Sequence, residues 1–254
     1  MIEQKALSYA NMYGVFGALH KLCELDSNAK EILQKIKKPI SVCFNVKDGP
    51  CRTFRFDKNG CKITEGADNS DCKMNFSSPE KFNLMINEGK PGMPVKGIIK
   101  LLIFLSGTFT ELTNRLTELL RPSEENLKDR AFFEESTLLT LYAIAGAISA
   151  LANQDSISRI SAENTVDGDI SLGIKDSVKI TLRVQDHHFT TLKTPTQTPR
   201  AIMEFASIDL AHGLFTGQVS TINEMCKGTI FLRGMISMLD NVNRILDRVS
   251  VYLG

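Results

Sequence analysis

The sequence lacks an excess of charge of either sign. Its 254 residues include 30 Lys and Arg and 29 Asp and Glu, which gives a formal net charge of +1. Proteins that bind a nucleic-acid backbone usually present a broad basic surface, because neutralised phosphates supply much of the affinity. The charge balance therefore indicates no nucleic-acid partner. With 43% hydrophobic and 23% charged residues, the composition is that of an ordinary globular protein.

The six cysteines lack the C-x-x-C spacing that is typical of zinc and redox sites. Five lie at positions 23, 43, 51, 61 and 72, and the second half of the chain holds only Cys226. Scattered cysteines of this kind are usually buried thiols. Residues 1–5 lead into no apolar run, so we expect no signal peptide, a cytoplasmic location and reduced thiols. We expect no cofactor.

No apolar run is long enough to cross a membrane. The longest, residues 138–152, is uncharged for fifteen residues and would span roughly 22 Å as a helix, whereas a bilayer core needs about 20 residues. The run 98–105 is shorter and contains Lys100. A helix that is apolar on every side is buried on every side. We therefore predict no transmembrane segment and a central helix over 138–152, clamped between two parts of the molecule.

The sequence also lacks a catalytic constellation. Asp186-His187-His188 could contribute to a metal site, but such a site needs three or four convergent ligands, and no other histidine lies nearby in the sequence. We expect His212 on the surface of a helix. Residues 89–92 (GKPG) do not have the spacing of a phosphate loop, and the G-x-S-x-G motif is absent. We therefore predict no catalytic residue, no metal and no enzymatic activity.

What the sequence contains is a repeat with an offset of 128 to 129 residues. Residues 42–48 (VCFNVKD) match 170–176 (ISLGIKD), and 114–116 (NRL) match 243–245 (NRI). A repeat of this length is a whole folding unit rather than a solenoid motif. We predict two copies of one small α+β domain: a first unit over 1–121 with N-terminal helices, a charged linker over 122–137, and a second unit over 138–254.

Each copy alternates between helical and strand periodicity in the same order. Asn59-Gly60 predicts a hairpin turn, and Ser78-Pro79-Glu80 predicts the start of a helix. In the first copy we expect helices over 3–24 and 28–38, an antiparallel sheet from four strands between 42 and 76, a helix from 79, a buried strand over 98–105 and a helix over 111–121. In the second we expect strands near 168–174, 178–184, 188–193, 200–206 and 228–234, and helices over 208–216, 220–226 and 235–252.

This order, together with residues 203–207 (MEFAS), Thr216-Gly217 and residues 227–234 (KGTIFLRG), resembles the sterol carrier protein (non-specific lipid-transfer) fold. Residues 71–82 and 85–89 of the first copy look similar. The resemblance implies that each copy is an antiparallel sheet covered by helices, with an apolar tunnel for lipid-like molecules and no catalytic residues. The first copy departs from it, because the unbroken apolar run 98–105 replaces the strand bracketed by glycines.

These observations support two hypotheses. In the first, the protein binds or carries a hydrophobic, lipid-like or sterol-like ligand in an apolar cavity, without catalysis. In the alternative, it is a structural module with filled cavities that binds a protein partner or forms a homodimer. The predicted lining residues are Phe82, Met85, Ile86, Leu101, Ile103 and Phe109 in the first copy and Leu214, Phe215, Met225, Phe231, Met235 and Met238 in the second. If either copy keeps a cavity, we expect it in the second, beside Phe215 and Phe231, between the 228–234 strand, the 208–216 helix and the closing helix.

Overall fold

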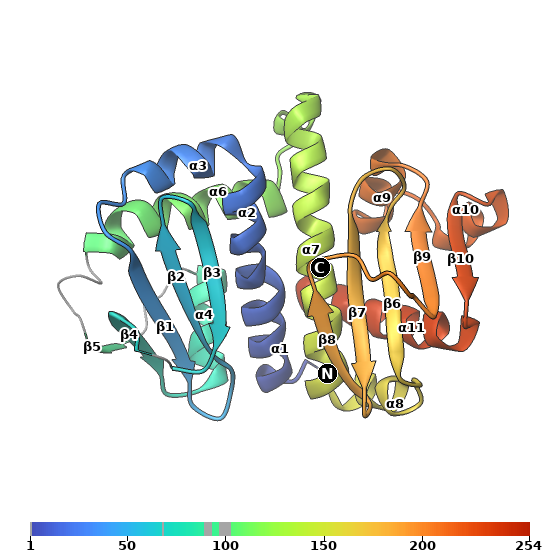
Figure 1. Cartoon of the computed structure of the whole chain (residues 1–254), viewed down its shortest axis with the longest axis horizontal. Helices are drawn as coiled ribbons and strands as arrows, with labels where there is room; N and C mark the ends of the chain where they lie inside the picture. The colour runs from blue at the N-terminus through green and yellow to red at the C-terminus, as the bar shows by residue number, and fades with distance from the viewer. Residues whose placement is uncertain (1, 68, 89–92, 97–102) are drawn as a thin grey trace.

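The computed structural model describes residues 2–67, 69–88, 93–96 and 103–254, and it has an α+β architecture (Figure 1). The first half contains α1 (Gln4–Ala10), the π-helical η1 (Asn11–Val15), the 3-10 turn η2 (Phe16–Ala18), α2 (Leu19–Leu25), α3 (Ser27–Gln34), β1 (Ile40–Val46), β2 (Cys51–Asp57), β3 (Gly60–Glu65), β4 (Cys72–Phe76), α4 (Pro79–Glu88), β5 (Met93–Lys96), the π-helical η3 (Leu105–Phe109), α6 (Thr110–Leu120) and η4 (Asn126–Lys128). The second contains α7 (Arg130–Gln154), α8 (Ser156–Glu163), β6 (Gly168–Ile174), β7 (Lys179–Gln185), β8 (His188–Leu192), β9 (Ala201–Phe205), α9 (Ile208–Phe215), α10 (Thr221–Lys227), β10 (Ile230–Gly234) and α11 (Ile236–Leu253).

The two halves build sheets with the same strand order. The first sheet runs β3-β2-β1-β4-β5, and the second, read in the same direction, runs β8-β7-β6-β9-β10. The sheets lie on the two outer sides of the molecule, and the rod formed by α1, η1, η2 and α2 runs beside α7 between them (Figure 1). Each sheet therefore faces the centre of the molecule through a layer of helices.

Both sheets are mixed, which corrects the prediction of antiparallel sheets. β1 pairs parallel with β4, and β6 pairs parallel with β9. The reason lies in the connections that precede β4 and β9. Thr53 Oγ1 donates a hydrogen bond to the Gly66 carbonyl, and Thr181 Oγ1 donates one to the Thr194 carbonyl, at 2.8 and 2.7 Å. After β3 and β8 the chain thus passes two strands and pairs beside β1 and β6 instead of forming a hairpin.

The N-terminal rod and α7 cross at two glycines. A Cβ atom on Gly146 would lie 2.3 Å from the carbonyl oxygen of Tyr13, and one on Gly14 would lie 2.8 Å from the carbonyl oxygen of Ala143. Only glycine permits this approach, because any side chain would push the two backbones apart. The crossing holds the two halves together at the centre of the molecule.

The predicted central helix is confirmed and is longer than expected. Within 138–152, every residue is buried except Leu138, Thr140 and Ile144, which are partly exposed. Among the described residues, α7 is the one helix that is long and apolar enough to cross a membrane, and 78% of its apolar stretch is buried inside the molecule, as in a core helix. α7 begins at Arg130, capped by Asp129, so residues 130–137 of the predicted linker are helical.

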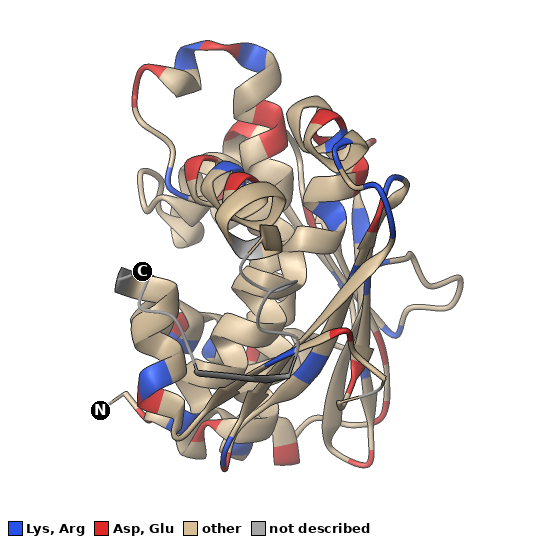
Figure 2. Ribbon diagram, turned by 90° about the vertical axis from the view of Figure 1, so that its left-hand side faces the viewer, with Lys and Arg blue, Asp and Glu red and all other residues tan. Residues whose placement is uncertain are grey.

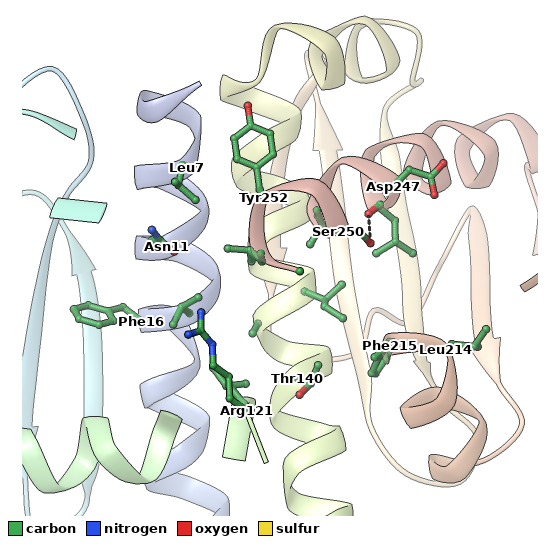
Figure 3. A pocket seen from close by; sticks show the side chains of 18 of the residues that line it. Leu7, Asn11, Phe16, Arg121, Thr140, Leu214, Phe215, Asp247, Ser250 and Tyr252 are labelled. Atoms are coloured by element: carbon green, nitrogen blue, oxygen red, sulfur yellow. Dashed lines mark hydrogen bonds between the residues drawn. The ribbon is translucent and has the colours of Figure 1, made fainter. Parts of the chain in front are cut away.

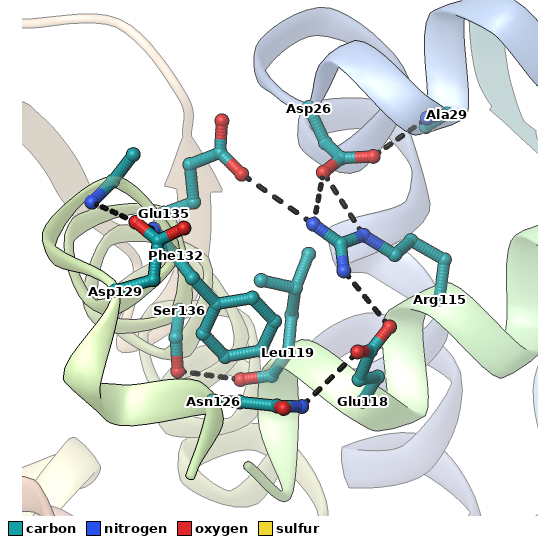
Figure 4. Close-up of polar contacts among 11 residues, drawn as sticks. Asp26, Ala29, Arg115, Glu118, Leu119, Asn126, Asp129, Phe132, Glu135 and Ser136 are labelled. Carbon is teal, nitrogen blue, oxygen red and sulfur yellow. Dashed lines mark hydrogen bonds and ion pairs between the residues drawn. The ribbon is translucent and has the colours of Figure 1, made fainter.

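A buried carboxylate fixes the first half at the turn between α2 and α3 (Figure 4). The side chain of Asp26 is 1% exposed. It accepts the Ala29 N–H at 2.6 Å, which caps α3, and it accepts two hydrogen bonds from Arg115 at 2.7 and 3.0 Å. Arg115 also pairs with Glu118 on its own helix and lies 3.7 Å from Glu135 of α7. This network ties α6 to α3 and to the central helix.

The second half has a corresponding carboxylate 129 residues later. Asp155 is fully buried between α7 and α8. It accepts the Ser158 N–H at 2.9 Å, the Tyr252 hydroxyl at 2.7 Å and the Arg248 guanidinium at 3.1 Å. The closing helix α11 is therefore fixed to the α7–α8 turn in the way that α6 is fixed to the α2–α3 turn.

Two sequence predictions about elements are wrong. The fifth strand of the first sheet is Met93–Lys96, whereas residues 103 and 104 of the predicted strand 98–105 are helical and Leu105 opens η3; residues 98–102 lie outside the described residues. A short apolar run fits a buried helix as well as a strand. Helix α8, which lies within a stretch where no element was expected, was missed.

Charged side chains of both signs are interspersed on the side of the molecule that carries the first sheet (Figure 2). This distribution accords with the net charge of +1.

Candidate functional site

The main cavity of the described structure lies between the two halves. It has a volume of about 1340 Å³ and is lined by α1, η1, α4 and α6 of the first half and by α7, β9, α9, α10, β10 and α11 of the second. Figure 3 shows it from close by: Leu7, Asn11 and Phe16 line one side, and Leu214 and Phe215 line another. We call this cavity the chamber.

The chamber is built from matching positions of the two halves. Ten pairs of its lining residues are separated by 129 residues, which is the offset of the sequence repeat. They include Asn11 and Thr140, Met74 and Met203, Ile86 and Phe215, and Asn114 and Asn243. Each half therefore turns the same face toward the centre, and the two faces enclose one shared space.

The second half provides an apolar wall. Met203 and Phe205 of β9 are only 7% and 5% exposed, and Phe205 packs edge-to-face on Phe215 of α9 with ring centroids 5.7 Å apart. Ile230 and Leu232 extend this wall onto β10. Surfaces of this kind bind apolar groups by excluding water.

Helix α6 provides a polar stripe on the opposite wall. Thr110, Thr113, Asn114, Thr117 and Arg121 all line the chamber, and their spacing of three or four residues places them on one helical face. The hydroxyls of Thr113 and Thr117 donate to the carbonyls of Phe109 and Thr113 at 3.0 and 2.9 Å. The chamber thus combines an apolar wall with this polar stripe of α6, which we call the polar rim.

Charged groups are few in the chamber. Among its described lining residues, Arg121 carries the one positive side chain, and Asp240 and Asp247 of α11 carry the negative ones. Asp240 pairs with Arg244 at 3.1 Å. Arg121 makes no ion pair with any described residue and is exposed.

Six of the predicted ligand residues line the chamber: Met85, Ile86, Phe109, Leu214, Phe215 and Met225. The expectation of a cavity beside the 208–216 helix and the closing helix agrees with this position. The predicted cavity was, however, placed within the second copy alone. The observed chamber extends across the junction to α4 and α6 of the first.

The structure places the other predicted residues elsewhere. Phe82 and Met238 are buried in the two cores, at 0% and 1% exposure, and Met235 packs against the second core. Ile103 is 70% exposed and does not line the chamber, and Leu101 lies outside the described residues.

Phe231 faces away from the chamber. Successive side chains of a strand point to opposite faces, and its neighbours Ile230 and Leu232 are the ones that line the cavity. Phe231 is accordingly 40% exposed. The prediction that a cavity lies beside Phe231 is therefore wrong, whereas Phe215 does line one.

The contribution of α6 was missed at sequence level, and Asn243 of α11, the predicted closing helix, was not among the predicted lining residues. Asn114 and Asn243 line the chamber from corresponding turns of these helices. The repeat already contained the signal, because NRL at 114–116 matches NRI at 243–245. What the sequence did not indicate is that these two turns line one shared space.

The structure also places the residues that were considered for metal or redox chemistry. Among the described residues, no group of three or more His, Cys, Asp and Glu side chains could hold a metal ion. Asp186 and His187 form the hairpin turn before β8, with φ of 49° and 61°. His212, expected on a helix surface, is instead buried beside Phe133, and burial lowers its pKa. Cys43 and Cys51 have sulfur atoms 3.8 Å apart and are not bonded.

No protein-family model matches the chain, and no curated protein does. Solved structures match at low identity. A ubiquinone synthesis protein, UbiJ-SCP2, is 11% identical over 44% of this chain and 96% of its own, with a TM-score of 0.35. Sterol carrier protein 2 is 16% identical over 43% of this chain and 92% of its own, with a TM-score of 0.33. A candidate sterol carrier protein from Thermus thermophilus is 14% identical over 43% and 86%, with a TM-score of 0.34. These values identify neither a family nor a ligand for this chain.

Proposed function

We propose that this protein binds and carries a hydrophobic, lipid-like molecule in the chamber, without catalysing a reaction on it. The observation that carries the proposal is a cavity of about 1340 Å³ whose apolar wall is drawn from β9, β10 and α9. In this proposal the chain is a duplicated domain of the sterol-carrier type, and the two ligand cavities of the copies have merged into one.

The size of the chamber supports a ligand larger than a metabolite. Pockets for drug-sized molecules usually measure about 300–1,000 Å³, and the chamber exceeds that range. Burial of ten methylene groups would contribute roughly 8 kcal/mol. Loss of ligand freedom offsets several kcal/mol of this. A micromolar affinity, which needs about 8 kcal/mol net, therefore requires a ligand that buries more than ten methylene groups.

A fluorescence assay with a neutral apolar probe, N-phenyl-1-naphthylamine, tests the proposal. Asn243 lines the chamber from α11, and Ser237 is an exposed residue of the same helix outside it. We expect the wild-type protein to bind the probe and Asn243→Trp to lose most of the binding, because the indole fills part of the cavity. Ser237→Trp, the matched control, should bind as the wild type does.

Two results would overturn the proposal. One is the absence of probe binding by the wild-type protein, combined with native mass spectra that contain no co-purified lipid. The other is equal binding by wild type and Asn243→Trp while both remain folded. Either result would favour the alternative, an interaction module, and the next experiment would be a search for a protein partner or homodimer.

A further inference from the structure

We propose that the ligand of the chamber carries an anionic headgroup, and that Arg121 binds it at the polar rim while the apolar tail lies against the wall of the second half. This inference rests on the proposed function and names the chemical class of its ligand. The class is a single-tailed or double-tailed lipid that ends in a carboxylate or a phosphate.

Arg121 is positioned for this task by the end of α6. Its N–H donates to the Thr117 carbonyl at 2.8 Å, so its backbone is still held by the last turn of the helix. Pro122 follows and prevents the helix from continuing. In Figure 3 the side chain of Arg121 rises from this point toward Asn11 and Phe16, which line the chamber.

Arg121 differs from most other arginines of the chain because its guanidinium has no carboxylate partner among the described residues. Arg115 and Arg248 are held by buried aspartates, and Arg130 is held by Glu134 and Asp209. Arg121 has no carboxylate partner among the described residues, yet it is the positive group of the chamber lining. A guanidinium presents a planar fork of donors that matches a carboxylate or phosphate.

The polarity of the chamber agrees with an amphipathic ligand bound in one direction. The wall of the second half near Phe205 and Phe215 is apolar and poorly exposed, whereas Arg121 is exposed to water. An apolar tail would be buried against the wall near Phe205 and Phe215, and a charged headgroup would stay hydrated beside Arg121, so each part of the ligand would lie in a favourable environment. Asp247 lies on the other side of the view in Figure 3, on α11, so it would not compete directly for the fork of Arg121.

The experiment compares palmitic acid with hexadecanol, which has the same chain length and a neutral head, as competitors of N-phenyl-1-naphthylamine. The variants are Arg121→Gln, Arg121→Lys and, as a matched control, Arg233→Gln. Arg233 is exposed on β10 and does not line the chamber. A lysophosphatidic acid titration distinguishes a phosphate from a carboxylate head.

We expect Arg121→Gln to weaken palmitate binding about three- to tenfold, as for a partly solvated charged pair, and to leave hexadecanol binding unchanged. Arg121→Lys should recover part of the affinity, and Arg233→Gln should behave as the wild type. Added salt should reduce the preference for palmitate. A stronger effect of Arg121→Gln on lysophosphatidic acid than on palmitate would assign the head to a phosphate.

The inference fails if Arg121→Gln weakens the binding of palmitate and of hexadecanol equally, or weakens the binding of neither, while the probe still binds. In that case the chamber binds lipid without recognising its head, and the proposed function stands. If the wild-type protein binds neither the probe nor either competitor, the proposed function itself fails. The two failures are therefore distinguishable in one set of titrations.

Discussion

Asp155 shows how one buried side chain can fix a whole element. Burial alone would raise the pKa of its carboxyl group, but hydrogen bonds from Arg248, Tyr252 and Ser158 outweigh burial and hold the pKa at about 2. The charged form is thus favoured in the folded protein over the unfolded chain, where an aspartate titrates near about 3.9. Ionised Asp155 therefore stabilises the fold above that pH and anchors α11 beside the chamber.

The first prediction concerns this anchor. Because the pKa is lowered in the folded state, the stability that Asp155 contributes is present above about pH 4 and is lost as the pH falls toward 2. We expect Asp155→Asn to reduce the free energy of unfolding at pH 7 by roughly 2 kcal/mol, and to make stability less dependent on pH between 4 and 2. Urea unfolding curves at several pH values measure both effects.

Asp240→Asn is the matched control for Asp155→Asn. Asp240 forms an exposed i,i+4 pair with Arg244 on the same helix, and such pairs contribute only about 0.3–0.5 kcal/mol. If both variants lost the same small amount of stability, the buried carboxylate would not have the anchoring role assigned to it.

At the scale of elements, the contact between the N-terminal rod and α7 sets the distance between the halves. The crossing depends on Gly146, where a Cβ atom would lie 2.3 Å from the Tyr13 carbonyl oxygen. Both elements also line the chamber, through Asn11 and Val15 on one side and Thr140 and Ile144 on the other. A change at the crossing should therefore affect stability and ligand binding together.

The second prediction tests this link with Gly146→Ala. Alanine favours a helix by about 1 kcal/mol over glycine, but the overlap with Tyr13 should cost about 1–3 kcal/mol, and we expect a net loss of stability together with altered probe uptake. Gly17→Ala is the control, because the atom nearest to its new Cβ, the Met12 carbonyl oxygen, would lie 3.8 Å away. Thermal unfolding of both variants measures the difference; a Gly146→Ala protein as stable as Gly17→Ala would contradict the close crossing.

Local sequence signals predicted the elements that depend on short-range chemistry. Helix α4 begins at Pro79, as Ser78-Pro79-Glu80 indicated, and Asn59-Gly60 lies in the hairpin between β2 and β3. Residues 103–105 of the run 98–105 were misassigned because periodicity cannot separate a short buried strand from a buried helix. Phe231 was placed in the lining because apolar character was counted without the alternation of side chains along β10.

At the scale of the whole molecule, the chamber could not be predicted from either copy alone. Its lining comes from matching faces of two halves with the same strand order, and the docking of those halves depends on contacts such as the Gly14–Gly146 crossing. Such contacts are non-local, so no sequence window contains them. The predicted repeat indicated part of the site, but not how the parts lie together.

The central claim is that one lipid-like ligand occupies the space shared by both halves. Photolabelling of the wild-type protein with a diazirine-bearing palmitic acid, followed by peptide mapping and native mass spectrometry, tests this claim most directly. We predict one ligand per chain, with labelled peptides from both halves that include Met85 or Ile86 and Leu214 or Phe215, and labelling that hexadecanol suppresses. Labels confined to one half, or to exposed residues such as Ile103 and Phe231, would contradict the account.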